Sequence, residues 1–446
     1  MQKNKHDFKS FLNFLKNHWL FVLIFITAII LHILVFKELG YKYNLDSDDL
    51  SYVEAGITLY ETGKLTMHGV LSAQIMPGMT FIIALFCLIF GTGSLLWLSL
   101  KIFWIVMGLT SMIYLYQTIR LYYKSVFAAI PCIFFLSLDY VWMNNIILTE
   151  TPFILSFLIL IYHSLKFARD KSNKEYIKII LWYIISLFIR PNIALFPIFL
   201  LIFLLLKKFD WKYLLKKALI AGIVVLITLL PWTYRNYKLF DSFIPLTYGA
   251  GNPLLLGTYQ GYNCPSDKDL DYKKNVDEKL SSEMYNYLYN DPKEKSYLKK
   301  YYSLEYDGLK AKYRMHEWWK KDKISMLKSY FFYKPKELIY SSFYWQEVLN
   351  ISANTNLLFR KIEIILFSLS TLIIFIKRKY LKEFIFLMTF YFSQIALYAY
   401  TFAFSRYAIS LFFLRYIIIG FGISTISEII KKRGVKNESI NDNSRI

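Results

Sequence analysis

The chain has 446 residues, of which 56% are hydrophobic and 19% aromatic, and its formal net charge is +21 at pH 7. This apolar content excludes an ordinary soluble domain and predicts an integral membrane protein. The Lys and Arg residues stand mostly in short clusters between apolar segments, which is typical of membrane topology and argues against nucleic-acid binding.

The first long apolar segment, residues 19–36, follows a lysine-rich N-terminus. It is longer than the apolar core of a signal peptide and no small-residue cleavage site follows it, so we predict a retained transmembrane helix. Further spans are predicted because their apolar stretches approach the length of about 20 residues that a membrane crossing needs. They are residues 96–116, 126–138, 152–165, 177–189, 193–206, 214–232, 357–376, 384–402 and 407–426.

An acidic cluster follows the first predicted span. Asp46, Asp48 and Asp49 stand close together, and Tyr52 comes just after them at the expected start of a helix. Acidic side chains are costly beside a bilayer, so the cluster is a candidate functional site. The alternative is a cap at the start of a solvated helix, where Asp is also common.

Residues 75–90 form an additional apolar segment that either crosses the membrane or lies along its surface. The basic clusters all fall on the cytoplasmic side only if this segment does not cross. We therefore predict an all-α polytopic membrane protein with about ten transmembrane helices. Residues 75–90 become an interfacial helix that Pro77-Gly78 opens and Gly91 closes.

The same rule, by which the basic clusters lie on the cytoplasmic side, divides the chain into regions. We predict an N-terminal transmembrane module at 1–234 that contains the first outer loop at 40–95, an extracytoplasmic helical segment at 235–356, C-terminal transmembrane helices at 357–430 and a polar cytoplasmic tail at 431–446. The tail is predicted to be disordered after Arg433. The extracytoplasmic segment has a glycine-spaced loop near its start and a Tyr/Lys-rich stretch interrupted at Asp291-Pro292. The notable polar residues then share the outer face, namely the acidic cluster, Asp139, Glu150, Arg190, Arg235 and Arg406.

These outer-face residues suit transfer from a lipid phosphate. A carboxylate such as Asp48 can take a proton from a hydroxyl or coordinate a divalent cation, and Asp49 can tune it by like-charge interaction. Basic side chains can hold an anionic leaving group, and the candidates are Lys101, Arg190, Arg235 and Arg406. The alternatives are a helix cap for Glu150 and membrane-interface anchors for Lys101, Arg190 and Arg406. The histidines form no metal-ligand motif and the cysteines show no paired spacing.

The order of these motifs resembles the bacterial GT-C membrane glycosyltransferases related to protein O-mannosyltransferases (glycosyltransferase family 39-like) and to lipid A aminoarabinose transferases. The matching motifs are Asp48-Asp49 followed by Tyr52, Met76-Pro77-Gly78, Thr149-Glu150-Thr151-Pro152, Arg190-Pro191, Arg235 and Arg406-Tyr407. Two departures are Gly78 in place of a second proline and the absence of a proline after Arg406-Tyr407.

The resemblance implies inverting transfer of a sugar from a polyprenyl-phosphate donor to an acceptor on the outer face of the cytoplasmic membrane. Asp48 would be the catalytic carboxylate, with Asp49 and Glu150 assisting with the acceptor or a metal. Arg406, Arg235 and Lys101 would meet the donor phosphate, together with Arg190, whereas Tyr52, Asp139 and Tyr407 are candidate substrate contacts. The expected partners are the donor, membrane lipids and a glycan, lipid or protein acceptor, with no nucleic acid. A divalent metal stays open, and no other cofactor is expected.

Two other function classes remain open. A lipid-linked sugar flippase or transporter should carry charged residues in the middle of its spans and two related halves, whereas the charges singled out here stand at outer helix ends. A polysaccharide polymerase or ligase also acts on lipid-linked sugars, and its site is expected in a late large loop.

Overall fold

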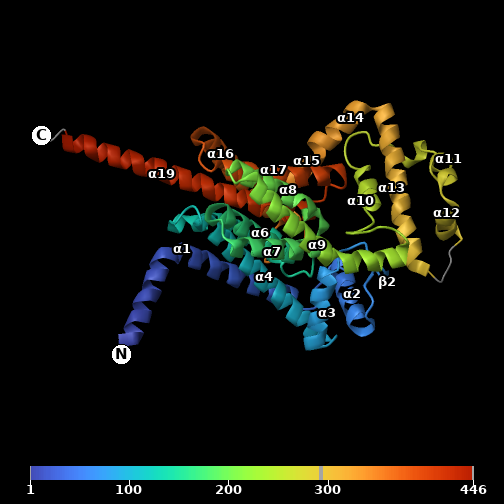
Figure 1. The fold of residues 1–446 in the computed structure, drawn as a ribbon, viewed down its shortest axis with the longest axis horizontal. Helices are drawn as coiled ribbons and strands as arrows, with labels where there is room; N and C mark the ends of the chain where they lie inside the picture. Colours follow the sequence, from blue (N-terminus) through green and yellow to red (C-terminus); the bar gives the residue numbers. More distant parts are fainter. Residues whose placement is uncertain (1, 291–294, 444–446) are drawn as a thin grey trace.

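The computed structural model describes residues 2–290 and 295–443. In these residues the secondary structure is helical apart from a short antiparallel hairpin of β1 (Thr66–Met67) and β2 (Val70–Leu71) and one isolated bridge. The predicted all-α class is therefore confirmed. Figure 1 shows the long helices bundled side by side, with both chain termini at one end of the molecule.

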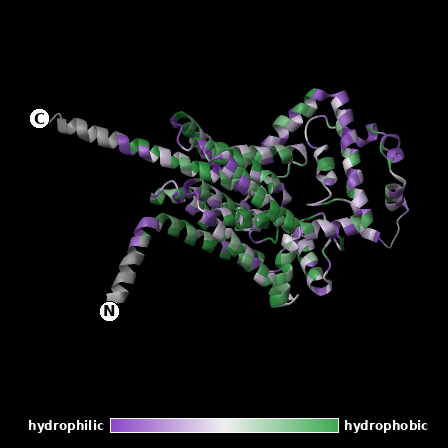
Figure 2. Cartoon of the chain, in the orientation of Figure 1, coloured by the Kyte–Doolittle hydropathy of each residue, from purple (hydrophilic) through white to green (hydrophobic). Residues whose placement is uncertain are grey.

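Five helices in the described part of the chain are long and apolar enough to cross a membrane. They belong to α1 (Gln2–Leu39), α4 (Ser94–Arg120), α6 (Glu150–Asp170), α9 (Trp211–Phe240) and α19 (Phe413–Asn443). Four of them cover a segment that the sequence predicted to span, and α19 covers the predicted span 407–426 from Phe413 onward. Figure 2 shows that the bundle is mainly hydrophobic. The polypeptide is thus a multi-span membrane protein.

The other predicted spans also form helices, which are α7 (Asn173–Ile189), α8 (Phe196–Leu206) after the 3₁₀ turn η2 (Pro191–Leu195), α16 (Ala353–Lys377) and α17 (Leu381–Tyr400). They are shorter or less apolar than the five, so the count of about ten crossings stays a prediction. Residues 126–138 differ from expectation, because they form the 3₁₀ helix η1 (Val126–Leu136) followed by α5 (Leu138–Met143). Pro131 lies inside η1 and has no N–H to donate to an α-helical ladder.

The first outer loop consists of α2 (Asp48–Thr62), the hairpin and α3 (Gly78–Phe90). As predicted, α3 starts directly after Pro77 and ends at Gly91, whose φ of 73° suits glycine. Its 13 residues extend about 20 Å, which is less than the hydrocarbon core of a bilayer. The helices α2 and α3 touch at Gly56, where a Cβ atom would lie 2.3 Å from the Ile83 side chain.

The segment at 235–356 folds into the long helix α13 and a set of short helices, which gather at the end of the molecule away from the termini (Figure 1). They are α10 (Gly251–Gly257), η3 (Asp267–Asp269), α11 (Tyr272–Asn275), η4 (Asp277–Lys279), α12 (Ser282–Tyr289), α13 (Ser296–Lys321), α14 (Lys323–Lys328), η6 (Ser329–Tyr333) and α15 (Lys334–Tyr340). The glycine-spaced loop has a packing reason: a Cβ at Gly251 would lie 2.1 Å from the Leu304 carbonyl oxygen. The predicted break at Asp291-Pro292 lies outside the described residues.

The prediction that the tail is disordered after Arg433 is wrong for the residues that the structure describes. Helix α19 continues through this segment to Asn443, so the described residues of the tail are helical. The last span and the tail are therefore one continuous element.

Cysteine labelling tests whether α3 lies along the membrane surface. Single cysteines at Thr62 and Thr92 flank α3, and a third at Lys124 lies beyond the far end of α4; all three positions are exposed. In a background with Cys87, Cys132 and Cys264 replaced, we expect a membrane-impermeant maleimide to label Thr62→Cys and Thr92→Cys from one side and Lys124→Cys from the other. Labelling of the Thr62 and Thr92 variants from opposite sides would show that α3 crosses.

Candidate active site

A cavity of about 450 Å³ lies where the first outer loop meets the ends of three helices of the bundle. Its size falls in the range of small-molecule sites. Its charged and titratable lining comes from Asp48 of α2, His68 of the hairpin turn, Arg190 at the end of α7 and Arg406 of the short helix α18 (Ser405–Ile409). Segments distant in the sequence thus supply one site.

Arg406 is the central cation of the cavity. Its Nη2 donates a hydrogen bond of 2.8 Å to Asp48 Oδ2, and its Nε lies 3.1 Å from Glu150 Oε1. Burial acts to lower the pKa of this guanidinium, but the charges of Glu150 and Asp48 outweigh burial and raise it above the ordinary value. Arg406 therefore stays charged although it is nearly buried.

Glu150 forms ion pairs with both Arg190 and Arg406. It is fully buried at the first residue of α6, and its Oε1 also accepts a hydrogen bond of 3.1 Å from Arg190 Nη1. Its negative charge also lies favourably at a helix N-terminus. Glu150 does not line the cavity, so it acts on the site through Arg190 and Arg406 rather than by contact with a bound molecule.

Arg190 reaches the cavity because Pro191 follows it. A residue before proline is pushed out of the helical conformation, and Arg190 has φ −144° and ψ 123° directly after α7. Its guanidinium then lies 5.6 Å from the ring centroid of Tyr407, which also lines the cavity.

Tyr52 follows Asp48 by one helical turn, so both side chains face the cavity from α2. Burial raises the pKa of the Tyr52 phenol, and the negative charge of Asp48 raises it further. The phenol therefore stays protonated at physiological pH and remains a hydrogen-bond donor.

Three other predicted site residues do not reach the cavity. Asp49 is buried and accepts hydrogen bonds from the backbone N–H groups of Leu45 (2.8 Å) and Ser47 (3.3 Å), which fixes the turn before α2. Lys101 is buried and donates to the carbonyl oxygens of Tyr43 and Asn145. Arg235 donates to the carbonyl oxygens of Ser72 and Leu65 at 2.7 and 2.8 Å. In each case nearby backbone groups hold the charged side chain away from the cavity.

Asp139 also lies elsewhere, in a buried network of four charges. Its Oδ2 accepts a hydrogen bond of 2.8 Å from Arg360, and Arg360 contacts Glu363 at 2.6 Å. Glu363 in turn pairs with Arg415 at 2.9 Å, so two acids balance two arginines. The network joins α5, α16 and α19, and it holds Asp139, a predicted substrate contact, away from the cavity.

Sequence reasoning missed Arg360, Glu363 and Arg415 although a signal was present. Glu363 and Arg415 stand inside predicted spans, where opposite charges indicate a buried pair or a functional site. Charged residues within spans, which the sequence analysis expected of a transporter and did not single out here, are therefore present in this chain. Their mutual neutralisation indicates a structural role.

Several cavity residues also escaped the sequence analysis, namely His68, Gln74, Asn192 and Tyr398. His68 occupies the left-handed conformation in the hairpin turn, with φ 52°, and its Nδ1 lies 3.0 Å from Ser51 Oγ. It belongs to no sequence pattern. Asn192, by contrast, directly follows Arg190-Pro191, and its Nδ2 donates to the Tyr398 hydroxyl at 2.8 Å.

The donor set at the cavity does not fit a metal held by side chains alone. No group of three or more His, Cys, Asp or Glu side chains is placed to hold a metal ion in the part of the chain that the structure describes. Asp48 and Glu150 also both contact Arg406, whose charge would repel a cation at that position.

One part of the chain matches a known family model. Residues 75–234 match the family model described as dolichyl-phosphate-mannose-protein mannosyltransferase, which confirms over these residues the resemblance predicted from the motifs. The matched region contains Glu150 and Arg190, whereas Asp48 and Arg406 lie outside it. No curated protein matches the chain significantly.

Two crystal structures of ArnT from Cupriavidus metallidurans match the fold at 13% sequence identity. One is in the apo state, with a TM-score of 0.41, and the other is bound to undecaprenyl phosphate, with a TM-score of 0.40. Each alignment covers 91% of this chain and 77% of the ArnT chain.

The buried network predicts a stability effect that depends on charge balance. Arg360→Met leaves Asp139 without its cation, and we expect a loss of about 3–5 kcal/mol because breaking a buried pair strands a charge. Asp139→Asn combined with Arg360→Met leaves the Glu363–Arg415 pair balanced and should recover part of that loss. Thermal unfolding of the purified protein measures both, with the exposed Lys361→Met as the matched control. Equal melting temperatures for Arg360→Met and Lys361→Met would contradict this role.

Proposed function

We propose that the protein is a glycosyltransferase that moves a sugar from a polyprenyl-phosphate donor to a hydroxyl group of an acceptor at the outer face of the cytoplasmic membrane. The observation that carries this proposal is a carboxylate in a cavity held by a buried arginine. The Asp48 side chain is 36% exposed and pairs with Arg406, and Arg190 stands beside them. The family match over residues 75–234 supports a glycosyltransferase. The expected position of the basic clusters on the cytoplasmic side supports an outer-face site.

In the proposed reaction Asp48 is the general base. The acceptor hydroxyl gives its proton to the Asp48 carboxylate while the hydroxyl oxygen forms a bond to the anomeric carbon of the donor sugar. The bond between that carbon and the phosphate oxygen breaks, and its electron pair leaves with the polyprenyl phosphate. Attack from the side opposite the leaving group inverts the configuration of the sugar.

In the proposed reaction Arg406 and Arg190 bind the phosphate of the leaving group. Arg406 and Arg190 face the same cavity, and a guanidinium suits bidentate contact with phosphate oxygens. Glu150 holds both guanidinium groups in place before the donor arrives, so little reorganisation is needed as negative charge builds on the phosphate. Glu150 is therefore a positioning residue, and Tyr52 and Tyr407 flank the bound sugar.

An adjoining cleft offers a separate entry for the acceptor. It has a volume of about 630 Å³, and Thr247, Ala250 and Thr401 line both the cleft and the cavity. Its outer wall is α13, which contributes Glu305 and Lys312. Two adjoining spaces with shared lining residues suit an enzyme that brings two substrates together at Asp48.

Asp48→Asn tests the catalytic assignment. We expect sugar transfer to fall by about 10²–10⁴-fold because the amide takes up no proton, while binding of polyprenyl phosphate changes little. Transfer from tritium-labelled polyprenyl-phosphate sugars to cell-envelope membranes measures the first quantity, and the exposed Asp46→Asn is the matched control. Full activity of Asp48→Asn would overturn the assignment. Movement of the lipid-linked sugar across vesicle membranes by the wild-type protein without covalent transfer would favour a flippase instead.

Glu150→Gln tests the positioning role. Loss of this charge leaves Arg190 and Arg406 without their shared partner, so we expect kcat to fall at least about tenfold while the KM for the donor stays unchanged or decreases. Glu150→Asp should recover part of the activity because it restores the charge. The exposed Glu54→Gln is the matched control, and melting temperatures check folding. A rise in donor KM with unchanged kcat would contradict the proposed role.

A further inference from the structure

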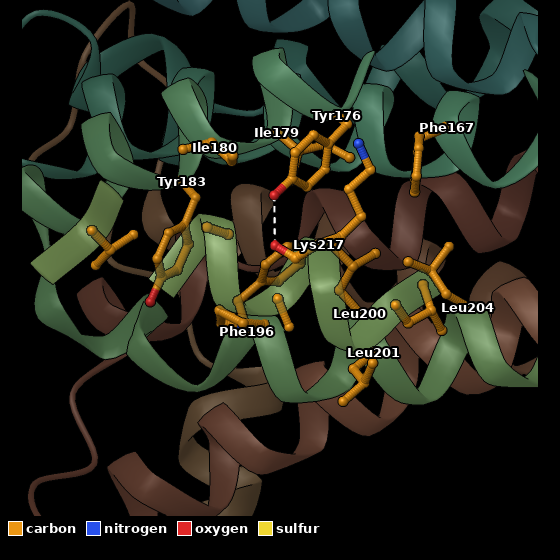
Figure 3. A pocket seen from close by; sticks show the side chains of 15 residues that line it. Phe167, Tyr176, Ile179, Ile180, Tyr183, Phe196, Leu200, Leu201, Leu204 and Lys217 are labelled. Atoms are coloured by element: carbon orange, nitrogen blue, oxygen red, sulfur yellow. Dashed lines mark hydrogen bonds between the residues drawn. The ribbon is translucent and has the colours of Figure 1, made fainter. Parts of the chain in front are cut away.

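A narrow apolar groove lies between α7, α8 and α9, toward the opposite end of α7 from the cavity (Figure 3). Its walls include Tyr176 and Tyr183 of α7, Leu200 of α8, and Ala221 and Val225 of α9. The groove residues Tyr176 and Tyr183 lie about 21 and about 10 Å from Arg190 along α7 at the normal rise of a helix, and the groove shares no lining residue with the cavity. The groove is therefore a different site from the candidate active site.

The groove exists because the middle of α9 stands away from the bundle. Leu214 near its start and Trp232 near its end are buried, whereas the residues between them are exposed or only partly covered until Leu229. Only 6% of the spanning stretch of α9 is buried, compared with 78% for α6. The side chains of Ala218 and Ala221, which line the groove from α9, are small and leave this space open.

Hydrocarbon is the physically suitable filling for this space. A gap between apolar side chains loses dispersion contacts, and water gains no hydrogen bonds along an apolar wall. Of the groove helices, α9 is long and apolar enough to cross a membrane, and α7 and α8 are predicted from the sequence to cross it. Acyl chains are the available filling in that environment. One lipid chain between α7 and α9 would restore the missing contacts.

The charge at one end of the groove indicates which lipid fits. Lys217 reaches along the groove wall toward Tyr176 (Figure 3), and its Nζ lies 4.4 Å from the Tyr176 ring centroid. The same Nζ donates a 2.9 Å hydrogen bond to Asn173 Oδ1. The neighbouring carboxylate of Glu175 is already paired with His163, Lys166 and Lys178. In the described residues Lys217 has no carboxylate within ion-pair distance, so its positive charge is available to an anionic headgroup.

We propose that this groove binds one anionic phospholipid, with an acyl chain between α7 and α9 and the phosphate at Lys217. The lipid belongs to the membrane leaflet opposite the candidate active site. It completes the packing of α9 against the bundle. This site does not depend on the proposed enzymatic function.

Native mass spectrometry of the purified full chain tests the proposal with phosphatidylglycerol and phosphatidylcholine as probes. We expect the first bound phosphatidylglycerol at a concentration at least about tenfold below that of phosphatidylcholine. Lys217→Gln should remove this preference, and the exposed Lys216→Gln is its matched control. Ala221→Phe should weaken binding of phosphatidylglycerol at least about tenfold by filling the groove, whereas Ile223→Phe on the exposed face should not.

Four results would overturn the proposal. Equal effects of Lys216→Gln and Lys217→Gln would mean that a basic surface attracts lipid without a site. Undiminished phosphatidylglycerol binding in Ala221→Phe would place the lipid elsewhere. If Ala221→Phe selectively lost binding of polyprenyl phosphate, the groove would hold the tail of the donor. If this variant lost a dimer instead, the groove would be the contact with a second copy of the chain. The milder Ala221→Leu serves if Ala221→Phe does not fold, as judged by size exclusion and thermal unfolding.

Discussion

The buried guanidinium of Arg406 is the constraint around which the candidate site is built. An arginine removed from water needs negative partners close by, because an unpaired buried charge is very costly. Its partners come from α2, 358 residues earlier in the chain, and from the start of α6. Neutralising one side chain thus fixes how the first outer loop and two distant helices meet. Arg190 completes the group through Glu150, so two acids balance two arginines.

A second balanced group of four charges shows what distinguishes a site from a scaffold. The network of Asp139, Arg360, Glu363 and Arg415 has the same composition as the cavity group, but its side chains are at most 3% exposed. Asp48, by contrast, is 36% exposed and faces a cavity of about 450 Å³. The chemistry proposed for Asp48 therefore rests on access rather than on the presence of a buried charge pair.

Apolar length and helix-ending residues predicted most of the elements, because Pro77, Gly91 and Pro191 act locally on the backbone. The direction of individual side chains followed other rules. Asp48 and Asp49 are adjacent, yet neighbouring residues on a helix point about 100° apart, so one faces the cavity and the other the preceding turn. Lys101 and Arg235 were singled out by charge, but backbone carbonyl groups that only the folded chain brings near them capture both side chains. Hydropathy also did not separate the 3₁₀ helix η1 from an α-helix.

Helix α7 links the apolar groove to the candidate active site. Helix α7 is continuous from Asn173 to Ile189, with the apolar groove near its start and Arg190 directly after its end. The groove and Arg190 are therefore connected by one uninterrupted helix. Small residues on α9 and the proline after Arg190 thus act on the same helix from its two ends. A lipid bound in the groove as proposed would therefore pack against the same helix that presents Arg190 to the cavity.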